Sequence, residues 1–92
     1  MEITEVRIRL LSKDDSKQRA KASFTIDNCF VIHDVKIIEG KNGLFVSMPN
    51  KKLSDGEHKD IVHAINNETR NMVMTTILKA YEDEVAKAQD VA

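Results

Sequence analysis

The sequence predicts an α+β domain, with an antiparallel β-meander sheet of about five strands followed by one C-terminal amphipathic α-helix. Through the first half of the chain, apolar and polar residues alternate as they do in half-buried strands. Beyond residue 66 the apolar residues recur at helical spacing instead. A chain of 92 residues has room for one modest core, so residues 1–92 are expected to form a single domain.

The first two strands are predicted from this alternation. In the run Val6–Leu10 the apolar residues share one face and the arginines share the other. A polar break from Ser12 to Gln18 follows, and alternation then returns from Arg19 to Ile26. We expect these two runs to pair as an antiparallel hairpin.

The next two strands are bounded by turn residues. Asp27 and Asn28 mark a turn, and the run Cys29–Ile38 is apolar on both faces, which predicts a central strand covered on both sides. Residues 40–43, Gly-Lys-Asn-Gly, are the strongest turn signal in the chain. Leu44–Met48 is the expected return strand, and the proline that follows it ends the strand by removing a ladder donor.

The second half contains a loop, a short strand and the helix. Residues 49–60 are expected to form a polar loop, of a length that is often functional. Ile61–Ile65 is expected to be a short strand, and Asn66 or Asn67 is a suitable N-cap. The helix of about 20 residues is predicted from one apolar stripe, which comprises Met74, Ile77, Leu78, Tyr81, Val85 and Ala88.

Composition limits the classes of function. The net charge is −1, and residues 1–59 carry 11 Lys and Arg against 9 Asp and Glu, so any phosphate binding must come from local patches. The single cysteine cannot form an intrachain disulfide, and the N-terminus does not read as a signal peptide. No apolar run approaches the length that spans a bilayer. A cytoplasmic location without membrane association is therefore expected.

No enzyme signature is found. The spacing of His33, His58 and His63 matches no usual metal motif, and Cys29 has no partner cysteine, so we expect no metal site and a buried thiol. The glycines form neither of the common phosphate-binding loops. The three phenylalanines lie on predicted strands and are expected in the core rather than as base-stacking platforms. We expect no cofactor and no small-molecule substrate.

The basic residues form two candidate clusters. The first lies on the predicted hairpin and comprises Arg7, Arg9, Arg19 and Lys21. Such a cluster is either a solvated face or a platform for phosphates, since like charges opposite each other on a sheet repel. The second has Lys51 and Lys52 in the polar loop, followed by Lys59 and by Arg70 near the helix start. A helix N-terminus also favours phosphate, so both readings of this cluster stay open too.

The central stretch resembles the signature of the SpoVG family of bacterial septation and sporulation regulators. The resemblance is carried by residues 30–40, Phe-Val-Ile-His-Asp-Val-Lys-Ile-Ile-Glu-Gly, and residues 43–49, Gly-Leu-Phe-Val-Ser-Met-Pro. It continues through Lys51-Lys52, Asp55-Gly56-Glu57, Lys59-Asp60-Ile61, His63 and Ile65-Asn66, and residues 5–9 are similar to the family's opening strand. Three positions depart from the family pattern, namely Lys52 for a common arginine, His58 for an aromatic residue and Ala64 for a proline.

The resemblance implies a compact homodimer that binds DNA and RNA and regulates genes. It implies that Lys51 and Lys52 match the family's basic pair. It also implies that sequence preference comes from the helix start, which comprises Asn66, Asn67, Glu68, Thr69 and Arg70. Our prediction is therefore a non-enzymatic, site-preferring DNA- and RNA-binding regulator of gene expression. The alternative is a protein-interaction adaptor in cell division or regulation that does not bind nucleic acid directly.

Overall fold

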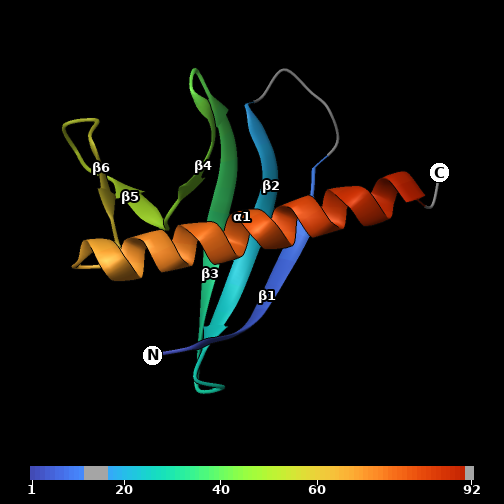
Figure 1. Ribbon diagram of the computed structural model, residues 1–92. Coiled ribbons are helices and arrows are strands. Elements are labelled where there is room, and N and C mark those ends of the chain that lie inside the picture. The colour runs from blue at the N-terminus through green and yellow to red at the C-terminus, as the bar shows by residue number, and fades with distance from the viewer. Residues whose placement is uncertain (12–16, 91–92) are drawn as a thin grey trace.

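A computed structural model describes residues 1–11 and 17–90 of the chain. Four antiparallel strands form one sheet in sequential order, and a small two-stranded hairpin and one long helix complete the domain (Figure 1). The sheet strands are β1 (Ile3–Leu10), β2 (Gln18–Ile26), β3 (Phe30–Gly40) and β4 (Gly43–Ser47). The hairpin strands are β5 (Asn50–Lys52) and β6 (His58–Asp60), and the helix is α1 (Asn67–Asp90). The predicted α+β class is confirmed.

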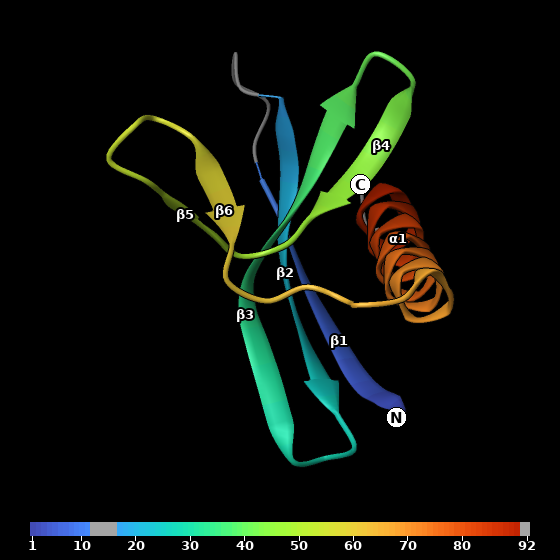
Figure 2. The same cartoon turned by 90° about the vertical axis from the view of Figure 1, so that its left-hand side faces the viewer.

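The strand register places the apolar partners on one face of the sheet. Ile8 lies opposite Ala22, Ala22 lies opposite Val35, and Ile37 lies opposite Val46. Helix α1 crosses this face, and no helix of the described residues lies on the opposite face (Figure 2). The buried core consists of residues from β2, β3 and α1, namely Ala20, Ala22, Phe24, Val35, Ile37, Val73 and Ile77.

Helix α1 begins where the sequence predicts. The Asn66 side chain accepts a hydrogen bond from the Thr69 amide at 2.8 Å, so Asn66 is the N-cap. Ile77, in the predicted stripe, is fully buried, whereas Ala88 at its far end is exposed. Val73 lies outside the predicted stripe, yet it is buried because it lies one turn before Ile77 on the same face.

The prediction of a strand at residues 61–65 is wrong. This segment is an irregular connection, in which Ile61 is 66% exposed and Ile65 is 89% exposed. Two short strands form instead inside the segment predicted to be a loop, with Lys51 opposite Lys59. The Ile61 amide donates to the Pro49 carbonyl at 2.7 Å and closes the base of this hairpin. Sequence alternation does not reveal these strands because neither of them buries an apolar face.

Three predictions of burial are also wrong. Cys29 is exposed and lies in the turn between β2 and β3, where Asp27 and Asn28 both have positive φ. Phe30 is 72% exposed and Phe45 is 42% exposed. The reasons differ. Phe45 lies on the face that the helix leaves open, since its neighbour Val46 pairs with buried Ile37. Phe30 pairs with Ile26 at the tip of β3, beyond the buried core, and Cys29 lies in the adjoining turn.

A β-bulge interrupts β3 on the open face. Ala22 pairs with Val35, but the next pair on the ladder joins Phe24 to Ile32, so β3 carries one extra residue between these pairs. Within this segment Asp34 has a φ of 63°, in the left-handed region that non-glycine residues rarely adopt. Bulges of this kind redirect side chains, and here His33 and Asp34 line a shallow hollow on the open face.

Candidate nucleic-acid interface

The open face of the sheet carries a row of cations across three adjacent strands. Arg9 of β1 lies opposite Lys21 of β2, and Lys21 lies opposite Lys36 of β3. Directly opposed Cα atoms on neighbouring strands are roughly 5 Å apart, so the row spans about 10 Å. Because side chains alternate along a strand, these three point away from the core residues that flank them. We call Arg9, Lys21 and Lys36 the cationic row.

The cationic row has no anionic partner among residues 1–11 and 17–90. Within the described chain, no carboxylate forms an ion pair with any of its three members. The row borders an open hollow of about 270 Å³, lined in part by Arg7, Arg9 and Lys21. Asp34 is the carboxylate in the lining of this hollow, and it comes from the bulge.

Two other predicted cations of the sheet do form ion pairs. Arg7 Nε donates to Glu5 Oε1 at 2.7 Å, and both side chains are largely exposed. The hydrogen bond from Arg7 to Glu5, followed by the charge of Glu5, raises the pKa of Arg7 above the ordinary arginine value. Arg19 pairs with Glu39. Arg7 therefore stays beside the cationic row with part of its charge compensated, and Arg19 is engaged with a residue of β3.

The hairpin of β5 and β6 carries the predicted loop lysines, but it separates them. Consecutive residues of a strand point to opposite faces, so Lys51 and Lys52 lie on different sides of the hairpin. Lys51 shares its face with Lys59, its direct cross-strand partner, and Lys52 lies opposite His58. The geometric pair is therefore Lys51 with Lys59. In Figure 2 the hairpin extends from the side of the sheet that faces away from α1.

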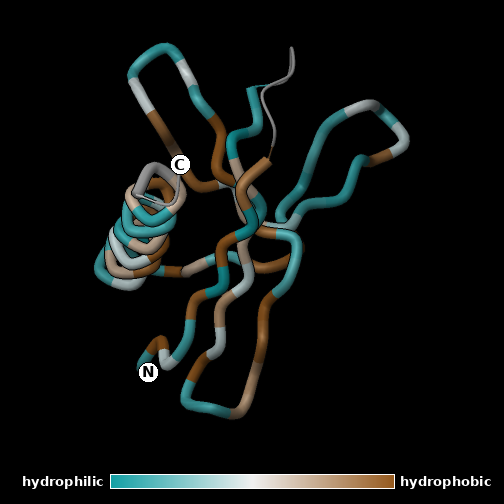
Figure 3. Tube along the Cα trace, turned by 90° about the vertical axis from the view of Figure 1, so that its right-hand side faces the viewer, coloured by the Kyte–Doolittle hydropathy of each residue, from teal (hydrophilic) through white to brown (hydrophobic). Residues whose placement is uncertain are grey.

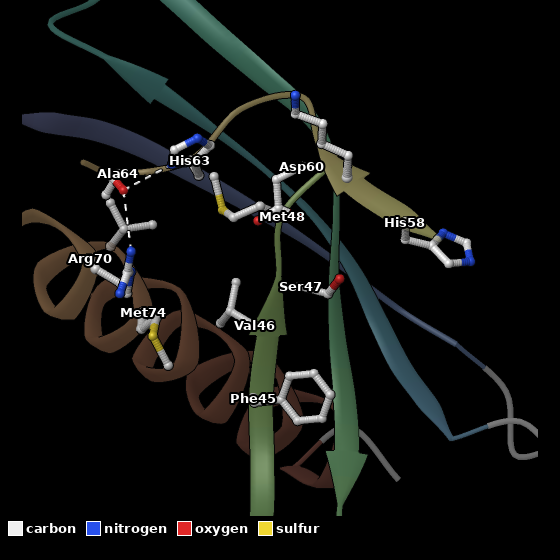
Figure 4. Close-up of a pocket in the computed structure, with 12 residues that line it drawn as sticks. Phe45, Val46, Ser47, Met48, His58, Asp60, His63, Ala64, Arg70 and Met74 are labelled. Carbon is white, nitrogen blue, oxygen red and sulfur yellow. Dashed lines mark hydrogen bonds between the residues drawn. The ribbon is translucent and has the colours of Figure 1, made fainter. Parts of the chain in front are cut away.

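The polar groups at the start of α1 already form hydrogen bonds with one another. The Asn66 side chain accepts a hydrogen bond from the Thr69 amide, and Glu68 adds a negative charge in the first turn. Arg70 Nη2 donates to the Ala64 carbonyl at 3.5 Å, and His63 Nδ1 donates to the same oxygen at 3.1 Å (Figure 4). Capping by Asn66 and the charge of Glu68 both reduce the attraction of this helix end for phosphate. Asn67 is exposed beside them.

Lys59 and Arg70 meet at a second hollow, beside the outer edge of β4. This space of about 630 Å³ lies between β4, the hairpin and the first turns of α1. Figure 4 shows Phe45 and Val46 leaving opposite sides of β4, so the hollow borders both sides of that strand. Its lining is mixed, with Met48, Val73 and Met74 as apolar members and His58, Lys59 and Arg70 as polar ones.

The twelve predicted site residues therefore divide into groups. The structure brings Arg7, Arg9 and Lys21 together, pairs Lys51 with Lys59, and sets Lys52 apart from both. The helix-start residues Asn66, Asn67, Glu68, Thr69 and Arg70 lie together at the cap, and Arg19 pairs with Glu39. Lys36 is the member of the row that the sequence did not predict. Its polar position between buried Val35 and Ile37 was the available signal, because it indicates an outward-facing residue.

Residues 1–11 and 17–90 offer neither a metal cluster nor a membrane-spanning helix. In that part of the chain no cluster of three or more His, Cys, Asp or Glu side chains could hold a metal ion. The helix within the same described residues is not apolar enough over a sufficient length to cross a membrane.

Comparison with known proteins gives a family over most of the chain. Residues 1–83 match the family model described as SpoVG. The chain is 53% identical over 92 residues, all of its own length and 97% of the other protein, to the "Putative septation protein SpoVG" of Thermoanaerobacter sp. (strain X514). Proteins of the same name from Caldicellulosiruptor bescii and Lachnospira eligens are 48% identical over 89 residues and 52% identical over 82 residues. These matches cover 97% and 89% of this chain, and 100% and 92% of the two relatives.

Proposed function

The chain belongs to the SpoVG family, and on that premise we propose that it is a regulatory protein, without enzymatic chemistry, that binds DNA and RNA through their phosphate backbones. It acts in the cytoplasm on gene expression, in the septation or sporulation setting that the resemblance implies. It uses no cofactor and no small-molecule substrate.

The main support for this proposal is the cationic row. Like charges that face each other directly on a sheet destabilise it, by up to about 1 kcal/mol for each pair. Arg9, Lys21 and Lys36 form two such pairs in succession and have no anionic partner within the described residues. A chain of phosphates laid over the row would relieve this repulsion and release counterions from the nucleic acid. A purely structural sheet face gains nothing from three opposed cations.

The hairpin supplies a second set of cations on the same side of the sheet as the cationic row. Lys51 and Lys59 share one face of the hairpin, and all six residues of β5 and β6 are exposed. Lysines reach phosphate as flexible point charges, so this pair suits backbone contact without sequence preference. Arg70 and Lys59 border the hollow beside β4 and can extend the contact toward α1.

A salt titration of binding to pooled DNA and RNA fragments tests the proposal. We expect log K to fall linearly with log salt concentration for the wild type. The double variant Lys51→Ala with Lys52→Ala should weaken binding and flatten that slope, by about 0.9 for each phosphate of duplex DNA that the protein no longer neutralises. Lys41→Ala is the matched control, because Lys41 is an exposed lysine in the turn between β3 and β4. If no saturable binding is observed even at low salt, the proposal is refuted.

We also propose that the protein acts as a homodimer. The chain has 7066 Å² of accessible surface, whereas a compact monomer of 10.4 kDa is expected to have about 5,400 Å². Its radius of gyration is 13.9 Å, against about 12.3 Å for a compact domain of this length. The excess surface is about twice the roughly 800 Å² that each partner buries in a standard interface.

The outer edge of β4 is the best candidate for the dimer contact. β4 is an edge strand, and it exposes Leu44 and Phe45 by 39% and 42%. Pairing with a second copy would satisfy the free backbone groups of this edge. Leu44→Lys should convert the dimer to a monomer in light scattering after size-exclusion chromatography, and Phe30→Lys, at the far end of β3, should not. A wild type that is monomeric at every accessible concentration would contradict the dimer.

A protein-interaction adaptor is the second candidate function. It is favoured by the same β4 edge, because an exposed sheet edge beside an apolar hollow can take an extended peptide as an added strand. An adaptor of this kind would show no saturable nucleic-acid binding near physiological salt. The salt titration therefore separates the two candidates.

A further inference from the structure

The hairpin of β5 and β6 stands apart from the rest of the fold. The two strands contact each other, and within the described residues neither makes an extensive contact with another element. All six strand residues are exposed, and Figure 3 shows the hairpin as hydrophilic along both strands. An isolated two-stranded hairpin is at best marginally stable in water. Its residues therefore contribute little to the core, and a role in binding accounts for them better than a role in folding.

The charges of the hairpin do not suit a simple backbone clamp. Between Asn50 and Asp60 the chain carries three lysines, and it also carries three carboxylates, at Asp55, Glu57 and Asp60. A surface built only for phosphates would exclude these acids, because they repel the backbone. The edges of DNA bases instead present both donors and acceptors, and carboxylates accept hydrogen bonds from the cytosine amino group.

One face of the hairpin carries side chains that can read bases. Lys52 lies opposite His58, and His58 Nδ1 lies 3.0 Å from Asn50 Oδ1. This contact orients the His58 ring and leaves its Nε2 available to a ligand. Asn50 Nδ2 donates to the Met48 carbonyl at 3.1 Å, which holds the amide in place. The face therefore offers a mobile ammonium group, a donor suited to N7 and O6 of guanine, beside a positioned imidazole. Because Nδ1 donates to Asn50 Oδ1, Nε2 of the neutral ring accepts, which suits the amino group of the paired cytosine.

The dimensions of the hairpin match the major groove of B-form DNA. The groove is about 12 Å wide and admits a two-stranded β-ribbon, whose backbones are about 4.8 Å apart. A-form RNA has a deep, narrow major groove that side chains do not read. The cationic row lies on the same side of the sheet as the hairpin and can hold the flanking phosphates (Figure 2).

We propose that the β5–β6 hairpin enters the major groove of duplex DNA, where Lys52 reads guanine and His58 reads the cytosine paired with it. This inference rests on the proposed function, and it adds the groove, the reading residues and a preference for duplex DNA over duplex RNA. Lys51 and Lys59, on the other face, serve the backbone rather than the bases.

The test uses duplexes whose purines are replaced by 7-deaza analogues, which lack only the N7 acceptor of the major groove. We expect the full-length wild type to bind a guanine-containing duplex at least about fivefold more tightly than its 7-deaza counterpart, the lower end for one base contact. It should also prefer duplex DNA to duplex RNA of the same sequence. A ligand that fills the minor groove should not compete.

Variants assign the effect to the hairpin. Lys52→Ala with His58→Ala should lose the discrimination against 7-deaza duplexes, whereas Lys41→Ala should keep it. Both altered side chains are exposed, so an unchanged thermal midpoint is expected and separates lost reading from lost folding. Equal wild-type affinity for natural and 7-deaza duplexes, with a normal salt slope, would overturn this inference and leave the proposed function standing. Absence of all nucleic-acid binding would overturn both.

Discussion

The two faces of the sheet differ in burial and in charge. The face under α1 holds the buried core, including Phe24 and Ile77, which are at most 2% exposed. The open face holds the cationic row and the bulge with Asp34. The covered face contributes stability through burial of apolar area, and the open face retains opposed charges that cost stability. The difference supports the proposal that the open face binds nucleic acid, since its opposed charges do not serve folding.

The largest expected effect is the loss of stability when a buried side chain of the covered face is removed. Phe24→Ala should lower the free energy of unfolding by about 3–5 kcal/mol, because it removes a buried aromatic side chain and leaves a cavity. Phe30→Ala is the matched control, since Phe30 is 72% exposed and its loss should change stability by no more than about 0.5 kcal/mol. Chemical denaturation measures both. Equal losses would mean that a partner buries Phe30, as in a dimer contact at the tip of β3.

The second effect appears on the open face and in binding rather than stability. Replacing Arg9, Lys21 and Lys36 together by Gln should reduce the slope of log K against log salt by up to about 2.7 on duplex DNA. The same variant should be at least as stable as the wild type, because the opposed charges are removed. A variant that loses stability while its salt slope stays unchanged would make the row structural and contradict the contrast between the faces.

A smaller effect tests the helix start as a structural cap. Asn66→Ala should cost about 1 kcal/mol of stability, since the Thr69 amide loses its acceptor. The cap is engaged within the helix, so the salt slope of nucleic-acid binding should not change. Asn66→Asp should keep the cap and the stability. If Asn66→Ala loses affinity for nucleic acid under conditions where the protein is fully folded, the helix start takes part in binding.

The smallest expected effect concerns the ion pair on β1. Glu5→Gln removes the carboxylate that raises the pKa of Arg7, but arginine stays charged at neutral pH in either case. Stability should not change measurably, because exposed pairs contribute little. Affinity for nucleic acid should rise slightly, since the charge of Arg7 is then uncompensated beside the cationic row. A fall in affinity, measured in the same salt titration, would mean that Glu5 positions Arg7 for binding.

Part of the candidate site followed directly from sequence. Arg7, Arg9 and Lys21 are predicted to share a face because alternation and hairpin pairing are local properties. The sequence did not predict Lys36 as a member of the cationic row. Its place there depends on the register between β2 and β3, which a bulge shifts by one residue. Lys51 and Lys52 are predicted as a pair in a loop, and the hairpin divides them because neighbours on a strand face opposite ways.

The sequence by itself determined the four sheet strands, the turns at residues 27–28 and 40–43, and the helix with its cap at Asn66. It did so because burying one face requires a period of two in strands and of 3.6 in helices, and both periods are visible in a single chain. Only the tertiary structure decided which surfaces stay open. One helix covers one face, so Phe45 on the other face is exposed, and Phe30 is exposed at the tip of β3, beyond the buried core. The hairpin of β5 and β6 also needed the structure, since strands that bury nothing leave no apolar pattern to find.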